Sequence, residues 1–167
     1  MHVRKWFRYP AGTPAPSLGP DWSSATHEPG AVGEIVSAAL REGFNRGFQR
    51  IVVFYADCPS LVPDILESVF EALEEEAEVV LGPTHRGGIY LVGARRKAAD
   101  LFASFPSWTT SELFALAKQR VEAAHLSLFV LPRMQPVETL EDWKNVSAEG
   151  WVPGPPTVTG GTGRPEG

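Results

Sequence analysis

Residues 50–73 read RIVVFYADCPSLVPDILESVFEAL, and this stretch decides the fold class. Its first part, residues 51–56, is a continuous apolar run with β-branched side chains, which is typical of a strand buried on both faces. Pro63 suits the first turn of a helix, and apolar residues follow it at helical spacing (Ile65, Leu66, Val69, Phe70 and Leu73). A buried strand followed by an amphipathic helix predicts a βα unit of an α/β protein.

The region around this unit continues to alternate between strand and helix. The apolar pattern predicts further buried strands at residues 78–82, 88–93 and 126–132. It also predicts a helix from Val32 to near Gly47, a helix at 95–105, and helices opened by two capping boxes, Thr109 with Glu112 and Thr139 with Asp142. Short connections between these elements predict a mostly parallel sheet with helices on both faces and one antiparallel strand.

The length of 167 residues fits a single domain, which we expect to span residues 1–152. Within it, residues 10–30 (PAGTPAPSLGPDWSSATHEPG) are rich in Pro, Gly, Ser and Thr, which predicts an irregular segment. Residues 153–167 (PGPPTVTGGTGRPEG) carry too few apolar side chains to offset the entropy lost on ordering. We therefore expect a flexible tail there.

Charge and composition exclude several classes of partner. Fifteen Lys and Arg residues against twenty Asp and Glu give a formal net charge of −5, without a long basic run. Nucleic acid is not an expected partner, because affinity for it depends on clustered positive charge. No apolar run reaches the roughly 18 to 20 residues that span a bilayer, and no secretory signal is recognisable. The single cysteine suits a reducing cytoplasm, and a homo-oligomer stays open.

Two acidic residues that follow predicted strands are candidates for a metal site. Asp57 comes after the strand at 51–56, and Glu138 follows the last strand, just before the capping Thr139. Because the carboxyl ends of parallel strands meet in one crevice, we expect these two carboxylates to lie close together. Such oxygen ligands suit Mg²⁺ or Mn²⁺, weakly held and completed by waters and substrate phosphates. Alternatively, Asp57 only caps its own turn.

The loop between the strands at 78–82 and 88–93 is a candidate ligand-binding loop. Gly87 and Gly88 would allow close approach of a phosphate or sugar, and His85 and Arg86 could contact anionic oxygens. The alternative is a β-hairpin whose glycines supply positive φ angles. Neither of the common phosphate-loop patterns, GxxxxGK[ST] or GxGxxG, is present. Nearby, Cys58 has no activating partner in the sequence and is predicted to be a buried, inert thiol.

Four segments, read in order, carry a family resemblance. They are RIVVFYADCPSLVPDILESVFEAL, EVVLGPTHRGGIYLVG, PSWTTSELF and VLPRMQPVETLEDW. They are similar to four motifs: Gly-Ser-Asp-x-Pro-x-Leu, Gly-Pro-x-x-Asp-Gly-Gly-Tyr-Tyr-Leu-x-Gly, Trp-Ser-Thr and Asp-x-Asp-Thr-x-x-Asp. These are the motifs of the bacterial glycosyltransferase-like family of small GT-A-fold proteins, which resemble nucleotidyltransferases in fold. The resemblance runs from about Glu28 to Trp143 and includes Gly33 and Glu34 in a helix motif.

This resemblance implies roles for individual residues. Asp57 and Glu138 stand at acidic motif positions, which implies that they bind the metal and act in catalysis. Residues implied to contact substrate are Glu34, His85, Arg86, Gly87, Gly88, Tyr90, Trp108 and Thr109. The chain also departs from the family: Arg86 and Pro136 replace acidic residues, and residues 1–20 lack the family's Lys/Arg-containing nucleotide loop.

The resemblance implies metal-dependent glycosyl or nucleotidyl transfer from a nucleotide or nucleotide-sugar donor. The departures at Arg86, at Pro136 and at the N-terminus predict that this activity is weakened or lost. The alternative is a non-catalytic descendant that kept the GT-A-like fold as a binding or interaction protein. The sequence does not separate glycosyl from nucleotidyl transfer.

Overall fold

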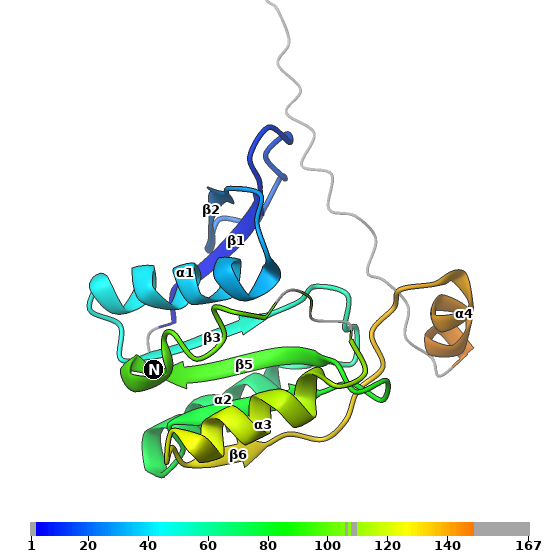
Figure 1. Ribbon diagram of the computed structural model, residues 1–167. Helices are drawn as coiled ribbons and strands as arrows, with labels where there is room; N and C mark the ends of the chain where they lie inside the picture. The colour runs from blue at the N-terminus through cyan, green and yellow to red at the C-terminus, as the bar shows by residue number, and fades with distance from the viewer. Residues whose placement is uncertain (1–2, 106, 108–109, 149–167) are drawn as a thin grey trace, which may run out of the picture.

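The computed structural model describes residues 3–105, 107 and 110–148, and a four-stranded mixed sheet forms its centre (Figure 1). The strands lie in the order β3 (Arg50–Phe54), β5 (Ile89–Arg95), β4 (Val79–Pro83) and β6 (Leu128–Val130). The sequence predicted all four strands, and it predicted that one of them runs antiparallel to the others. The prediction of a mostly parallel sheet is wrong: β5 lies inside the sheet and runs antiparallel to both neighbours, and only β4 and β6 form a parallel pair.

Strand β3 lies at an edge of this sheet, whereas the sequence predicts a strand buried on both faces. Its residues are half-buried up to Val53, and Phe54 is 37% exposed. By contrast, every residue of β4 and all of β5 except Arg95 are buried. The apolar run in β3 reflects helices packed on its two faces, because both α1 (Val32–Asn45) and α2 (Pro63–Glu75) contact it.

Helices cover both faces of the sheet, as predicted. On one face, α1 and α3 (Leu113–Ala123) form a core with alternate strand residues; it contains Val36, Leu40, Phe44, Val79, Leu81, Leu113, Ala117 and Val121. On the other face, α2 packs through Val69, Leu73 and their neighbours against Val80, Tyr90 and Leu91. Helix α2 begins at Pro63, and α1 ends just before Gly47, whose φ of +91° suits a helix C-terminus.

An irregularity in β5 decides which of its side chains face α2. The pairing with β4 shifts between Gly82 and Pro83, so that Gly82 lies opposite Leu91 while Pro83 lies opposite Ile89. Tyr90 is the extra residue of this bulge. As a consequence Tyr90 and Leu91 both belong to the α2 side of the core, which strict alternation along a strand would not allow.

The N-terminal region differs from the prediction of an irregular segment at residues 10–30. Strands β1 (Lys5–Pro10) and β2 (Trp22–His27) form a separate parallel pair, which Figure 1 shows beyond α1 from the main sheet. The Trp6 ring packs edge-on against Phe48, with 5.2 Å between ring centroids. Residues 11–21 and 28–31 are without helix or strand.

Residues 96–105 and the C-terminal helix lie outside the strands of the main sheet. The helix predicted at 95–105 is only a 3₁₀ turn, Arg96–Ala98, followed by turns, and Phe102 and Phe105 are buried there. The last helix, α4 (Leu140–Ala148), stands apart from the sheet in Figure 1. The predicted tail at 153–167 lies outside the described residues. None of the described helices has the length and apolar character needed to cross a membrane.

Ser37 provides a test of the core beneath α1. Its side chain is fully buried, and its hydroxyl has no hydrogen-bond partner among the described residues. Because an unsatisfied buried hydroxyl costs free energy, we expect Ser37→Ala to raise the free energy of unfolding in urea by about 1 kcal/mol. Ser68→Ala is the control, since its hydroxyl donates to the Ile65 carbonyl (2.8 Å) and its loss should not stabilise. A decrease for Ser37→Ala would contradict this.

Candidate functional site

The loops that follow β3, β4 and β6 gather at one edge of the main sheet, because these three strands run in the same direction. Backbone hydrogen bonds join the loops directly. The Val137 N–H donates to the Asp57 carbonyl (2.8 Å), and the His85 N–H donates to the Met134 carbonyl (3.0 Å). We call this region, formed by residues 55–62, 84–88 and 131–139, the loop edge. It is where ligands bind in open α/β sheets.

Arg86 lies at the centre of the charged groups of the loop edge. One guanidinium nitrogen, Nη1, lies 2.9 Å from Oε2 of Glu138, and the other, Nη2, lies 2.7 Å from Oδ1 of Asp142. The guanidinium thus joins two carboxylates from the segment that follows β6. The Arg86 side chain is nevertheless 49% exposed, so its remaining N–H groups can reach a ligand.

Asp142 is the fixed partner in this arrangement. It is only 4% exposed, and its Oδ2 accepts hydrogen bonds from the N–H and hydroxyl of Thr139 (2.9 and 2.8 Å). In return the Asp142 N–H donates to the Thr139 hydroxyl (3.1 Å), which confirms the predicted capping box. Burial alone would raise the pKa of Asp142, but the hydrogen bonds from Thr139 and Glu138 and the charge of Arg86 lower it.

The structure brings Asp57 and Glu138 into the same neighbourhood. Burial raises the pKa of Asp57, the hydrogen bond with its own backbone amide lowers it, and the negative charge of Glu138 raises it. The residue as a whole is still exposed and open to ligand. Asp57 was expected to follow a central strand, but it follows the edge strand β3. Next to it, Cys58 is 5% exposed, and burial together with the charge of Asp57 raises the pKa of its thiol to about 12, so it is unreactive.

These groups do not form a preformed metal centre. Among the described residues, no group of three or more His, Cys, Asp or Glu side chains could hold a metal ion together. One oxygen of Glu138 is paired with Arg86, and both oxygens of Asp142 accept hydrogen bonds. The guanidinium also places a positive charge where a divalent ion would need negative ligands. The residues present therefore do not fit a resident Mg²⁺ or Mn²⁺ ion.

Residues 84–88 form the loop of the β4–β5 hairpin, which is the alternative that the sequence left open. Gly87 has a φ of +87°, and its N–H donates to the Thr84 carbonyl (3.2 Å). The Gly88 N–H donates to the Thr84 hydroxyl (2.9 Å). Both glycine N–H groups are thus used within the turn, and neither points freely at a ligand.

The other predicted substrate contacts are dispersed. His85 is exposed on the loop edge beside Arg86, and Glu34 is exposed in the first turn of α1. Tyr90 is only 1% exposed, and its hydroxyl donates to the Pro132 carbonyl (3.1 Å), so this side chain belongs to the core. Trp108 and Thr109 lie outside the described residues.

Sequence reasoning did not foresee the ion pairs of Arg86 or the buried position of Asp142. The sequence did contain a sign of these ion pairs. Arg86 stands where the motif of the similar family has an acidic residue, although four neighbouring motif residues are kept (Gly82, Pro83, Gly87 and Gly88). An arginine among acidic motif positions favours pairing with one of them.

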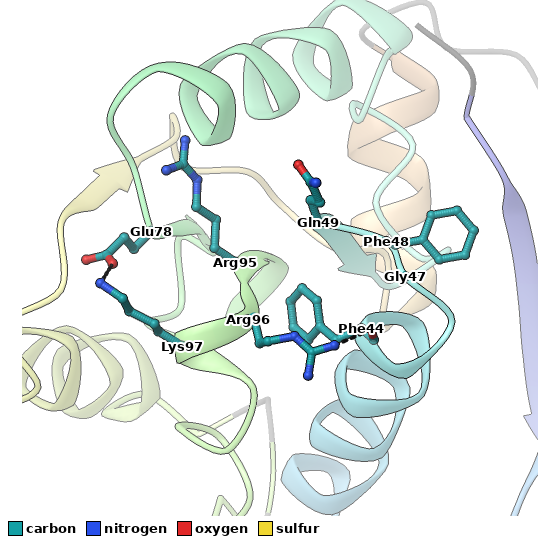
Figure 2. Close-up of a pocket in the computed structure, with 8 residues that line it drawn as sticks. All are labelled: Phe44, Gly47, Phe48, Gln49, Glu78, Arg95, Arg96 and Lys97. Atoms are coloured by element: carbon teal, nitrogen blue, oxygen red, sulfur yellow. Dashed lines mark hydrogen bonds and ion pairs between the residues drawn. The ribbon is translucent and has the colours of Figure 1, made fainter.

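A cavity of about 410 Å³ lies at the opposite end of the sheet, where β5 ends (Figure 2). Its lining consists of Phe44, Gly47, Phe48, Gln49, Glu78, Arg95, Arg96 and Lys97. Arg95 donates to the last carbonyls of α2, at Leu73 and Glu74 (2.5 and 2.7 Å), and Arg96 donates to the Phe44 carbonyl near the end of α1. These cations satisfy helix C-termini, so we assign the cavity to the scaffold rather than to the candidate site.

Comparisons with known proteins agree with this architecture. The family model described as an uncharacterized protein conserved in bacteria (DUF2064) matches residues 5–110. The chain belongs to this family. Its fold is similar to the crystal structure of a "putative nucleotide-diphospho-sugar transferase" from Desulfovibrio desulfuricans G20, with a TM-score of 0.75 and 22% identity.

This match covers 87% of the present chain and 66% of the Desulfovibrio protein, so the chain spans about two thirds of that protein's length. A search of curated proteins found no significant match. The resemblance inferred from the four sequence motifs is thus supported at the level of fold.

The tight hairpin loop gives a stability prediction. A Cβ atom at Gly87 would lie 2.0 Å from the Ser111 carbonyl oxygen, whereas one at Gly47 would meet open space, although both glycines have positive φ angles. Gly47→Ala should therefore cost only backbone strain, about 1 kcal/mol. Gly87→Ala should cost about 3 kcal/mol or more, because the loop must also move. Urea unfolding compares the two variants, and equal losses would show that the loop moves away from Ser111 freely.

Proposed function

We propose that this protein binds a nucleotide-linked ligand at the loop edge, and that it catalyses glycosyl or nucleotidyl transfer only weakly. The observation that carries the proposal is the convergence of Asp57, Arg86 and Glu138 at the ligand-binding edge of the sheet. The fold shared with the Desulfovibrio protein supports the class of ligand.

The exposed side chains of the loop edge have distinct parts in this proposal. Arg86 uses two of its five N–H donors on Glu138 and Asp142, and because its side chain is 49% exposed, a diphosphate could accept hydrogen bonds from the remaining donors. Asp57 is an exposed carboxylate without an ion-pair partner in the described residues and would accept the proton of an attacking hydroxyl. Glu138 is less suited to that role, because its Oε2 atom is already paired with Arg86.

Several features make this site weaker than a complete nucleotide site. The Gly87 and Gly88 N–H groups are already used, and residues 11–21 contain no Lys or Arg that could contact a phosphate. The carboxylates of Glu138 and Asp142 are paired with Arg86, and Asp57 adds a further negative charge near Glu138, so these carboxylates oppose an anionic ligand. We propose that the N-terminal part of this chain has diverged from the family's nucleotide-binding unit.

Calorimetry with uridine diphosphate and its sugar conjugates tests the binding. Two missing charge-assisted contacts correspond to about 3–6 kcal/mol, so affinity should be about two to four orders of magnitude below that of a complete site. Arg86→Gln should abolish binding. Arg41→Gln is the control: it removes an exposed ion pair (3.0 Å) between Arg41 on α1 and Asp100, and it should leave binding unchanged. Absence of any nucleotide binding to the wild type would contradict the proposal.

The Arg86–Glu138 ion pair also favours a second candidate function, a non-catalytic binding protein, because it occupies the carboxylate expected to assist transfer. Release of nucleotide from a nucleotide sugar, followed by chromatography with and without Mn²⁺, separates the two. We expect slow release that Asp57→Asn removes without changing nucleotide affinity. Binding without any release would identify the non-catalytic function instead.

A further inference from the structure

We propose that Arg86 is the built-in cation of the loop edge: its guanidinium takes the place of a divalent ion between Glu138 and Asp142 and keeps such an ion out. The inference concerns the site of the proposed function, but it does not depend on nucleotide binding. It replaces the sequence-based expectation of Mg²⁺ or Mn²⁺ at this site.

The contacts of Arg86 resemble those of a shared cation. Its two terminal nitrogens bind carboxylates of two different residues, Glu138 at 2.9 Å and Asp142 at 2.7 Å. These are the oxygen atoms that a divalent ion bridging the two residues would require. Because the guanidinium is delocalised and always charged, it satisfies both carboxylates with one positive charge.

Both ends of this arrangement are held in place. On the arginine side, the hairpin loop is fixed by the His85 N–H bond to Met134 and by the close packing of Gly87 on Ser111. On the carboxylate side, Asp142 is buried and anchored by the Thr139 capping box. Moving Arg86 out of the site therefore costs free energy, because the Oδ1 atom of the buried Asp142 would lose its cationic partner.

Removing the guanidinium would leave a set of oxygen ligands. Glu138 would regain both oxygens, Asp142 would regain part of Oδ1, and Asp57 lies within electrostatic reach of Glu138. Glu138 and Asp142 would then lack their shared cation, and Mg²⁺ or Mn²⁺ can be held by one or two carboxylates together with waters. The positive charge of Arg86 between Glu138 and Asp142 opposes the binding of a divalent ion by these two residues.

Titration with Mn²⁺ alone, followed by electron paramagnetic resonance, tests this inference on the full chain. The wild type should bind Mn²⁺ weakly, and Arg86→Gln should bind it at least about tenfold more tightly. Arg86→Lys is the matched variant, because it also loses the two-pronged contact but keeps the charge, and it should bind like the wild type. Arg133→Gln removes another arginine that contacts this loop, at the Thr84 carbonyl (2.9 Å), and should also bind like the wild type.

Three results would overturn the inference: equal Mn²⁺ affinity in the wild type and Arg86→Gln, a gain in Arg86→Lys as large as that in Arg86→Gln, or retention of the gain in an Arg86→Gln/Glu138→Gln double variant. Circular dichroism confirms that each variant is folded. Should Arg86→Gln not fold, melting of the wild type in MnCl₂ and in EDTA decides: equal melting temperatures agree with the inference, and stabilisation by Mn²⁺ overturns it.

Discussion

Strand β5 is the element on which the rest of the structure depends, because it is inserted antiparallel between β3 and β4 and buries residues from Ile89 to Ala94. Its side chains contribute to the core on both faces. Gly93 lies under α2: a Cβ there would lie 3.0 Å from Val69 and 3.1 Å from Leu73, so these two side chains would have to shift to accept a larger residue. Gly82 is likewise covered by a neighbouring side chain, because the ring of Tyr90, the bulge residue, lies where a Cβ of residue 82 would be.

The direction of β5 also positions the site. Since β5 starts at the edge where β3, β4 and β6 end, its hairpin loop lies beside the loops that follow those strands. This places Arg86, from the hairpin, against Glu138 and Asp142, which are more than 50 residues away in sequence. Asp142 accepts the capping hydrogen bonds of Thr139 at Oδ2 and the Arg86 guanidinium at Oδ1, so the start of α4 and the charge balance of the site use different atoms.

The local patterns of the sequence predicted the elements that depend on nearby residues. Helices α1 and α2, the four strands of the main sheet and the capping box of α4 follow from apolar spacing, Pro63 and the pair Thr139 and Asp142. Strand order was not accessible, because a run such as residues 51–56 is equally apolar at an edge covered by two helices and in the middle of a sheet. The 3₁₀ turn at Arg96–Ala98 was missed because residues 102–105 pack tightly on Gly33, a long-range contact.

The candidate site illustrates the same division. Topology alone predicted that Asp57 and Glu138 follow strands of one direction, and the structure joins their loops through the Val137 bond to Asp57. Comparison with the acidic motifs one position at a time misses a further effect. A reversal of charge at position 86 changes the role of the carboxylates beside it. With an acid in place of Arg86, Glu138 would be a free ligand. With arginine at this position, the guanidinium pairs with Glu138 and Asp142. These carboxylates then neutralise a cation that belongs to the protein instead of binding one from solution. The fold and its loops are compatible with either state, so the identity of one side chain decides which ions the loop edge attracts.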